Sequence, residues 1–340
     1  MPWWFRISFI HSDTQTMILA GDIGGTSTRL ALFEKTGERL RIAIEKVYPS
    51  QQHASLEEIV RKFIAEHPMA ITAAAFGIAG PVRDGRVQTP NLAWIVDGKV
   101  VAREMGLENV GLINDLEANA WGIAALQDND FVTLNPGAPQ ATGNQAVISA
   151  GTGLGEAGLY WDGQRHRPFA CEGGHCDFAP RNAAEMRVLA FLLAEFDRVS
   201  YERLLSGPGL HNIFRALRSA EARTGRDAFD ASLATGDPSA AISRAALEGS
   251  HPIAVQALEI FVSLYGAEAG NVALKMMASG GVFIGGGIAP RIIEKMQGPS
   301  FIDAFLAKGR MRPLLEAMPV KVILNDKTAL MGAGRFAATQ

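Results

Sequence analysis

Residues 17–33 read MILAGDIGGTSTRLALF, in which two short apolar runs flank a polar segment rich in glycine. The runs at 17–20 and 30–33 have the length and apolar character of strands, and the glycines between them are typical of a turn. This stretch therefore predicts a strand, a tight loop and a second strand, followed by a polar turn at 34–38.

The same order of features returns at residues 146–163, which read AVISAGTGLGEAGLYWDG. An apolar run is again followed by a loop of glycine and threonine, a second apolar run and a turn. Two copies of one hairpin in one chain indicate a duplicated architecture.

Patterns typical of helices and strands alternate along the rest of the chain, which predicts an α/β fold. Helices are predicted at 56–66, 116–126, 183–196, 253–277, 289–296 and 328–338, and strands at 70–78, 110–113, 282–284 and 320–324. The residues of the helix at 183–196 that are expected to face a core are Met186, Leu189, Leu192, Leu193 and Phe196. The best candidate for a linker is the segment 135–145.

The composition excludes several classes of protein. A chain of 340 residues predicts two domains, because one domain usually holds about 100–200 residues. Hydrophobic residues make up 48% and charged residues 20%, which is a normal globular balance. The net charge of −3 gives no basic excess for a nucleic-acid partner. Two cysteines form no disulfide framework, so a reducing, cytoplasmic compartment is expected.

The first sixteen residues, MPWWFRISFIHSDTQT, are predicted to lie outside the fold. Arg6, His11 and Asp13 interrupt their apolar run, so we expect no signal peptide. No segment of the chain reaches the roughly 18 continuous apolar residues of a membrane span, so no membrane partner is expected. Met17 is the expected functional start, and deletion of residues 1–16 should leave activity unchanged.

Three glycine-rich segments are candidate phosphate or nucleotide loops, because glycine lets a backbone approach a phosphate closely. The first comprises Gly21, Asp22, Ile23, Gly24, Gly25 and Thr26; the second contains Gly151, Thr152 and Gly153; the third is Gly285, Gly286 and Gly287. An ordinary hairpin or strand-to-helix turn is the alternative for each. The second loop precedes a strand, whereas a dinucleotide fingerprint opens a helix, and the chain has no GxxxxGK[ST] phosphate motif.

Polar residues outside these loops suggest further chemistry. Asp115 follows a predicted strand, where α/β proteins often place catalytic groups, although a helix N-cap is an equal alternative. Glu172 and His175 lie among small residues, and their oxygens and nitrogens suit a ligand with many hydroxyl groups. A metal site that uses Cys171, His175 and Cys176 is the less favoured alternative, because a fourth ligand is missing nearby.

Together these segments resemble the bacterial-type glucokinases, which are ATP-dependent sugar kinases of the actin–hexokinase–Hsp70 superfamily. The matching stretches occur in family order from Met17 onward: GDIGGTSTRLAL (21–32), GIAGPV (77–82), NLAW (91–94), LINDLEANAWG (112–122), SAGTGLGEA (149–157), EGGHCDFAPRN (172–182), YERLLSGPGL (201–210) and GGVFIGGGIAPR (280–291).

The resemblance implies a role for each candidate residue. Asp115 matches the catalytic base that accepts the proton of the glucose 6-hydroxyl group. The residues that match the glucose-binding set are Asn91, Asn114, Asp115, Glu172, His175 and Glu202. The loops at 21–26 and 151–153 match the ATP phosphate loops, with Asp22 near Mg²⁺ through water, and the loop at 285–287 matches the adenosine side.

The resemblance also implies a two-lobed actin-like ATPase fold, with duplicated ribonuclease H-like domains and the ligands in a cleft between the lobes. The expected small lobe is 17–126 with about 320–340, and the expected large lobe is 127–319. Expected ligands are D-glucose, ATP and Mg²⁺. The protein is expected to be a cytoplasmic homodimer, without the structural zinc of the related repressor–kinase family.

Three alternatives remain at this stage. The chain could phosphorylate another sugar, such as fructose, mannose or an amino sugar. It could be a sugar-responsive repressor, although the residues before Met17 are too few for a DNA-binding region. It could be a chaperone-like ATPase, which would not carry Glu172, His175 and Glu202.

Overall fold

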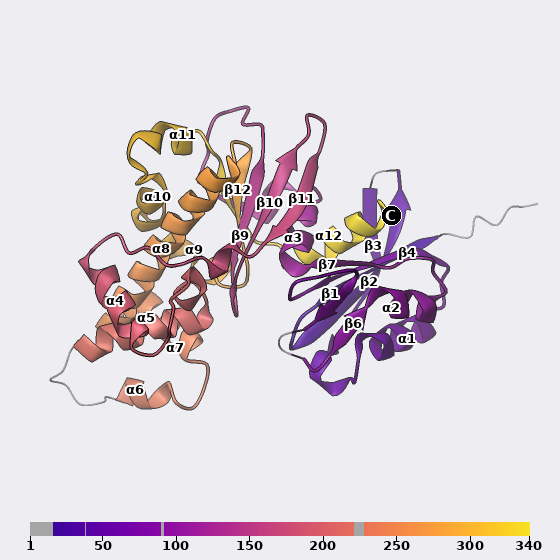
Figure 1. Ribbon diagram of the computed structural model, residues 1–340, viewed down its shortest axis with the longest axis horizontal. Helices are drawn as coiled ribbons and strands as arrows, with labels where there is room; N and C mark the ends of the chain where they lie inside the picture. The colour runs from indigo at the N-terminus through magenta and orange to yellow at the C-terminus, as the bar shows by residue number, and fades with distance from the viewer. Residues whose placement is uncertain (1–15, 38, 90–91, 221–227) are drawn as a thin grey trace, which may run out of the picture. The chain divides into compact units, whose positions relative to one another are not determined.

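The structure is a computed structural model that describes residues 16–37, 39–89, 92–220 and 228–340. The chain forms two compact units, each built on a sheet of its own (Figure 1). Unit 1 comprises the described residues up to Asp115 together with 333–340, and unit 2 comprises 116–332. The predicted extension at 1–16 lies almost entirely outside the described residues.

Unit 1 contains a five-stranded sheet with the order β3-β2-β1-β4-β7. The strands are β1 (Met17–Ile23), β2 (Ser27–Thr36), β3 (Arg39–Pro49), β4 (Ile71–Ile78) and β7 (Gly111–Asn114). The pairing of β1 with β2 is antiparallel, which confirms the predicted hairpin, and β1 and β4 are parallel. The connecting loop is shorter than predicted, because β1 continues to Ile23 and β2 begins at Ser27.

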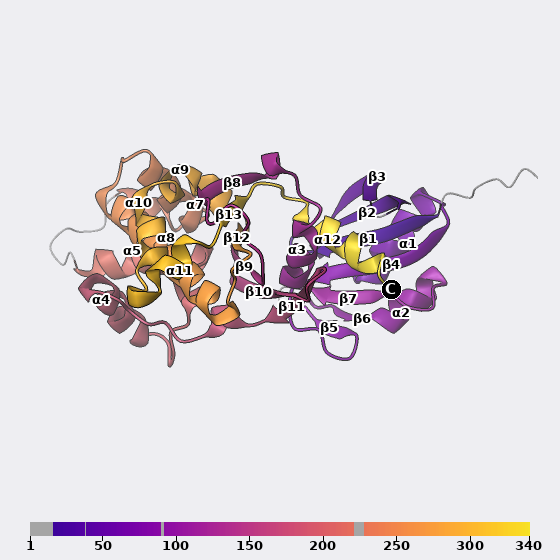
Figure 2. The ribbon, with the colours of Figure 1, turned by 90° about the horizontal axis from the view of Figure 1, so that it is seen from above.

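Helices cover both faces of this sheet. On one face, α1 (Leu56–Glu66) and α2 (Gly98–Met105) pack against the strands, and the side chains of Leu56, Ile59, Val60 and Phe63 are fully buried. The other face holds the end of the C-terminal helix, α12 (Thr328–Ala337) (Figure 2). A Cβ atom on Gly334 in this helix would lie 3.2 Å from the ring of Phe33. The remaining elements are η1 (Ser50–Gln52) and the hairpin of β5 (Arg86–Gln88) and β6 (Ile95–Asp97).

Unit 2 contains a six-stranded sheet with the order β11-β10-β9-β12-β13-β8. The strands are β8 (Phe131–Asn135), β9 (Gln145–Ala150), β10 (Leu154–Trp161), β11 (His166–Cys171), β12 (Gly281–Gly285) and β13 (Val320–Ile323). Strands β9, β10, β11, β12 and β13 repeat the order and directions of β1, β2, β3, β4 and β7. This match confirms the duplicated architecture that the two hairpins predict.

Most helices of unit 2 pack on one face of its sheet, around α8 (Pro252–Met276). They are α4 (Ala183–Leu193), α5 (Gly207–Ala220), α6 (Ala228–Ser232), α7 (Pro238–Leu247), α9 (Ile293–Met296), α10 (Pro299–Leu306) and α11 (Arg312–Glu316). The short turns of unit 2 are η2 (Asp128–Asp130), η3 (Gly173–His175), η4 (Tyr201–Arg203), η5 (Ala289–Ile292) and η6 (Gly309–Met311). The opposite face is covered by α3 (Asp115–Ile123).

The helix α8 is the one element of the described residues that is long and apolar enough to cross a membrane by length and composition. In this structure 72% of its most apolar window is buried, and its sequence is interrupted by Glu259 and Glu268. Its burial is that of a core helix.

Two predicted boundaries between the lobes are wrong. The family resemblance places the strand near 320 in the small lobe, but β13 pairs with β12 and β8 in unit 2, because its apolar residues belong to that core. Residues 116–126 also belong to unit 2, where Ala120 and Ile123 pack on the sheet. The segment 135–145 links no lobes, since β8 and β9 lie in the same sheet.

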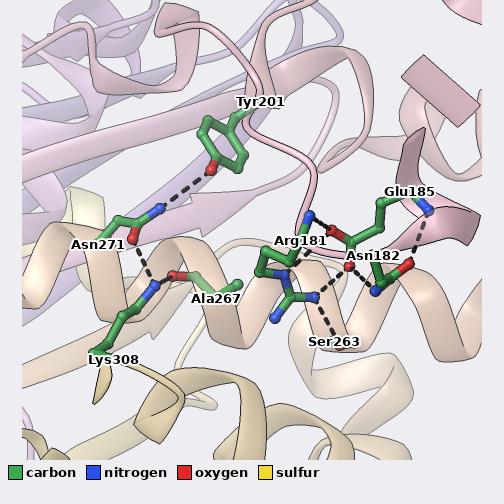
Figure 3. Close-up of polar contacts among 8 residues, drawn as sticks. All are labelled: Arg181, Asn182, Glu185, Tyr201, Ser263, Ala267, Asn271 and Lys308. Carbon is green, nitrogen blue, oxygen red and sulfur yellow. Dashed lines mark hydrogen bonds and ion pairs between the residues drawn. The ribbon is translucent and has the colours of Figure 1, made fainter. Parts of the chain in front are cut away.

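The predicted inward face of the helix at 183–196 is also wrong in part. Leu192 is buried, but Met186 and Leu193 are 56% and 51% exposed. The buried stripe includes Glu185, because its carboxylate accepts hydrogen bonds from Arg181 and from the amide of Asn182 (Figure 3). A satisfied carboxylate can therefore occupy a position that hydrophobic periodicity gives to an apolar residue.

Two glycines allow α3 and α12 to approach closely. A Cβ atom on Gly122 would lie 2.0 Å from the carbonyl oxygen of Thr328, and one on Gly332 would lie 1.7 Å from that of Ala118. Backbone atoms cannot rotate away as a flexible side chain can, so the helices would have to separate.

We expect Gly332→Ala to lower the free energy of unfolding by about 1–3 kcal/mol, because the added methyl group overpacks this crossing. Urea or thermal unfolding measures the change. Gly236→Ala is the control, since a Cβ there meets no atom within 4 Å. A loss in Gly332→Ala no larger than in the control would contradict the expected clash.

Candidate functional site

The first glycine-rich loop connects β1 and β2 and is held by Ser50. The N–H of Gly24 donates to the carbonyl of Ser27 at 2.9 Å, which closes the turn. The buried Ser50 donates its hydroxyl to the carbonyl of Gly24 at 2.7 Å and its N–H to that of Thr26 at 3.0 Å. The hydroxyl groups of Thr28 and Ser50 lie 3.0 Å apart. Two carbonyl groups of the loop are thus fixed by a residue that the sequence patterns did not single out.

The predicted residues of this loop have different surroundings. Gly21 is a packing residue in β1, because a Cβ there would lie 2.5 Å from the ring of Phe76. Ile23 is buried in the core of unit 1. Asp22 is half-buried and lies two residues before Gly24. Gly25 and Thr26 complete the turn, so the connection itself begins at Gly24.

Asn114 and Asp115 lie where β7 passes directly into α3. The side-chain amide of Asn114 donates to the carbonyl of Gly80 at 3.1 Å, which ties this corner to the turn after β4. Asp115 is half-buried and begins α3. The N-terminus of a helix favours a negative charge, so this position supports an ionised carboxylate.

The second glycine-rich loop connects β9 and β10 in unit 2. Its turn is closed by the N–H of Gly151, which donates to the carbonyl of Gly153 at 2.8 Å. The carbonyl of Gly151 accepts a hydrogen bond from the N–H of Gly207 at 2.8 Å, at the start of α5. A Cβ on Gly151 would meet no atom within 4 Å, so this glycine borders open space.

The third glycine-rich segment packs directly on the second. Gly286 has a φ of +83°, and a Cβ there would lie 2.3 Å from the carbonyl oxygen of Ala150. The fully buried Tyr265 of α8 links the two segments: its hydroxyl accepts from the N–H of Ala150 at 3.0 Å. The same hydroxyl lies 3.4 Å and 3.3 Å from the carbonyl oxygens of Ile148 and Gly285. One hydroxyl group therefore sets the spacing of both strand ends.

A cavity of about 470 Å³ opens beside these two segments, entirely within unit 2. This volume falls within the range of small-molecule sites. Burial, and then the charge of Arg215, hold the pKa of His211 below its usual value. The cavity is lined by Gly151, Thr152, Gly207, Pro208, His211, Asp237, Pro238, Ser239, Gly287, Ile288 and Arg291.

The structure brings Glu172, His175 and Glu202 together in unit 2. His175 Nε2 lies 4.0 Å from an oxygen of Glu172, and His175 Nδ1 lies 4.0 Å from an oxygen of Glu202. All three side chains are partly exposed, and η3 and η4 position them. The other oxygen of Glu202 accepts from the N–H of Leu154 at 3.0 Å, which joins this cluster to the second glycine-rich loop.

The remaining candidate residues are Asn91, for glucose binding, and the two cysteines, for a metal site. Asn91 lies outside the described residues. Cys171 and Cys176 are free thiols. Within the described ranges, no group of three His, Cys, Asp or Glu side chains is placed to hold a metal ion. The loop at 21–26, Asn114 and Asp115 belong to unit 1, whereas the other described candidates belong to unit 2.

Comparisons with known proteins agree with this set of features. A family model described as Glucokinase matches residues 19–340. The glucokinase of Nostoc sp. (strain PCC 7120) is 41% identical over 339 residues, which cover 95% of this chain and 99% of that protein. The chain belongs to the glucokinase family. The reaction of that family, phosphorylation of glucose by ATP, is therefore the activity of this chain.

Solved glucokinase structures share its fold. One from an Antarctic psychrotroph has a TM-score of 0.83 at 29% identity and covers 95% of this chain and 99% of that one. A ROK-family glucokinase of Streptomyces griseus, solved with glucose and AMPPNP, has a TM-score of 0.60 at 24% identity and covers 95% and 100%. The similarity to these solved structures confirms the predicted two-lobed α/β actin-like ATPase fold.

We expect Tyr265→Phe to raise the KM for ATP severalfold, because loss of the hydroxyl releases the N–H of Ala150 and loosens both glycine-rich segments, which the family resemblance assigns to ATP. Initial-rate kinetics with each substrate varied separately measure the effect, and the KM for glucose should change less. Tyr48→Phe is the matched control, since it removes a buried tyrosine hydroxyl that bonds Glu66 in unit 1. Equal effects on both KM values, or on both variants, would contradict this role.

Proposed function

We propose that the chain transfers the γ-phosphoryl group of ATP to the 6-hydroxyl group of D-glucose, with Asp115 as the base, and releases glucose 6-phosphate and ADP. The observation that carries the proposal is the hydrogen bond between Glu202 and the N–H of Leu154. It connects the cluster suited to sugar hydroxyl groups with the loop suited to phosphate. Phosphoryl transfer depends mainly on such mutual positioning of its two reactants.

The proposed sugar contacts come from Glu172, His175 and Glu202 in unit 2 and from Asn91 and Asn114. Two carboxylates on either side of an imidazole offer several acceptors and a donor to a polyhydroxylated ring. The hydrogen bond from Asn114 to Gly80 supports this role, because it restricts the side chain next to Asp115.

In the proposed reaction, the oxygen of the glucose 6-hydroxyl group forms a bond to the γ-phosphorus. The bond from that phosphorus to the bridging oxygen of ADP breaks, and Asp115 accepts the hydroxyl proton. An aspartate at the N-terminus of α3 suits this role, since the helix favours its ionised form before the proton arrives.

For the nucleotide, we propose that the cavity beside Gly151 and Gly287 receives the adenosine part of ATP. Open space at both glycines supports this, because a Cβ on either would meet no atom within 4 Å. The loops at 24–26 and 151–153 would then present backbone N–H groups to the phosphates.

Asp22 is the proposed contact for Mg²⁺, through water. A half-buried carboxylate next to the first glycine-rich loop has the oxygen donors that this ion prefers. One carboxylate is sufficient, since Mg²⁺ keeps several waters and shares the substrate phosphates. When bound, the ion supplies positive charge beside the phosphate oxygens. The absence of a structural zinc stays a prediction.

The cytoplasmic location and the homodimer are also proposals. Both cysteines of the chain are free thiols, which suits a reducing compartment. The dimer rests on the family resemblance, and light scattering of the purified protein measures it directly.

We expect Asp115→Asn to lower kcat by about 10²–10⁴-fold, because the amide cannot accept the hydroxyl proton. A coupled assay that detects glucose 6-phosphate measures the rate, with fructose and mannose scored by release of ADP. Asp128→Asn, which changes an exposed aspartate of η2, should keep the wild-type rate. A loss of less than tenfold in Asp115→Asn would argue against the proposed base.

We expect Gly287→Val to raise the KM for ATP at least about tenfold without lowering the melting temperature. The added side chain meets no protein atom at its Cβ, yet it enters the cavity proposed for adenosine. Gly287→Ala should give a smaller increase in the same direction. Unchanged KM values for ATP in both variants would contradict the proposal that adenosine binds in this cavity.

A further inference from the structure

A buried carboxyl group lies directly beneath the segment that carries Glu172 and His175. Glu156 belongs to β10, is 2% exposed and pairs in register with Cys171, the last residue of β11. A Cβ atom on Gly173 would lie 1.8 Å from Glu156 Oε2. The backbone of the turn η3 therefore rests on this carboxyl group, and only glycine at 173 leaves it room.

The carboxyl group of Glu156 is incompletely satisfied. Its Oε1 atom is buried and has no hydrogen-bond partner. Burial, and then the charge of Glu268, raise the pKa of Glu156 to about 7, against an opposing effect of Lys275. An unpartnered buried carboxylate is unfavourable, whereas the protonated form carries no charge that needs a partner.

The neighbouring carboxylate, Glu268 of α8, differs because its oxygens are satisfied. It accepts hydrogen bonds from Asn271 at 2.7 Å and from Lys275 at 3.3 Å. Asn271 also bonds the hydroxyl of Tyr201 at 3.2 Å and Lys308 at 2.6 Å (Figure 3). Tyr201 and Glu202 both belong to η4, so this network reaches the element that carries Glu202.

Several titratable groups face Glu156 from the elements packed around it. The helix α8 contributes Glu268, Lys275 and Tyr265, and β11 contributes Cys171. One step further away, Glu172 and Cys176 interact with Cys171, and Tyr201 and Lys308 interact with Glu268. The lysine amino groups are hydrogen-bonded to Glu268, Asn271 or the carbonyl of Ala267. Ionisation of Glu156 thus adds a negative charge that no direct cation partner offsets.

We propose that Glu156 is a positioning residue for sugar binding: its neutral form supports the Gly173–Gly174 backbone and keeps His175 between Glu172 and Glu202, and its ionisation weakens glucose binding. This proposal rests on the glucose-binding roles proposed for Glu172, His175 and Glu202. The link is steric and electrostatic. An ionised carboxylate needs water or a hydrogen-bond donor at Oε1, and the side chain must move against the backbone that carries those residues to reach one.

The test is the pH profile of the KM for glucose in the wild type and in Glu156→Gln, measured from pH 5.5 to 8.5 with saturating MgATP. The wild-type KM should rise about fivefold or more as pH increases through the range near 7. Glutamine has the shape of the neutral acid at every pH, so that rise should be lost and the KM should stay at its low-pH value. A rise in the KM of Glu156→Gln like that of the wild type would overturn the proposal.

A second variant, Glu268→Gln, covers the case in which Glu156→Gln does not fold. Removing the charge of Glu268 removes the repulsion on Glu156 and leaves Lys275 to stabilise its ionised form. The rise in KM should then begin at a lower pH than in the wild type. A purely structural role would instead change the KM by the same factor at all pH values.

Thermal unfolding separates the titration of Glu156 from its effect on sugar. A carboxyl pKa raised from 4.5 to about 7 means that the native state loses stability as pH rises between these values. Glu156→Gln should therefore gain melting temperature over the wild type at pH 8 but not at pH 5. This gain with an unchanged KM profile would overturn the proposal and leave the proposed function standing. A wild type that binds no glucose at any pH in calorimetry would overturn both.

Discussion

Close contact between backbones at glycine is the constraint on which the two glycine-rich segments of unit 2 depend. The carbonyl of Ala150 occupies the space that a side chain at 286 would need, and Tyr265 then bonds both strand ends from inside the core. That spacing determines the cavity and the open space at Gly151 and Gly287. It also lets the N–H of Gly207 approach the carbonyl of Gly151. The first glycine-rich loop lacks such a tyrosine contact in its described bonds and uses the buried Ser50 instead.

In both units, helices bury both faces of the duplicated sheet. In both units the antiparallel hairpin is followed by parallel strands, and one face is covered by helices that the unit itself supplies. The second face is covered by α3 in unit 2 and by the end of α12 in unit 1. A sheet that is apolar on both faces must bury both, so these two helices complete cores that the duplicated strands leave unfinished.

Charged groups inside unit 2 are tolerated because most of them are hydrogen-bonded. Glu185 is surrounded by donors from Arg181 and Asn182, and Glu268 is bonded to Asn271 and Lys275. Glu156 lacks a partner at one oxygen, and burial raises the pKa of its carboxyl group. Glu156, the residue of β10 beneath η3, therefore differs chemically from the buried carboxylates of Glu185 and Glu268.

The sequence alone determined both hairpins, the α/β alternation, the helix at 56–66 with its buried face, and the candidate residues of the site. These features depend on local periodicity and on glycine, which act within a few residues. Tertiary structure decided that β13 belongs to unit 2, that Met186 and Leu193 face solvent, and that Ser50, Tyr265 and Glu156 support the glycine-rich segments and η3. Such contacts join residues far apart in the chain, and their energies depend on burial and on partner geometry, neither of which has a local pattern in the sequence.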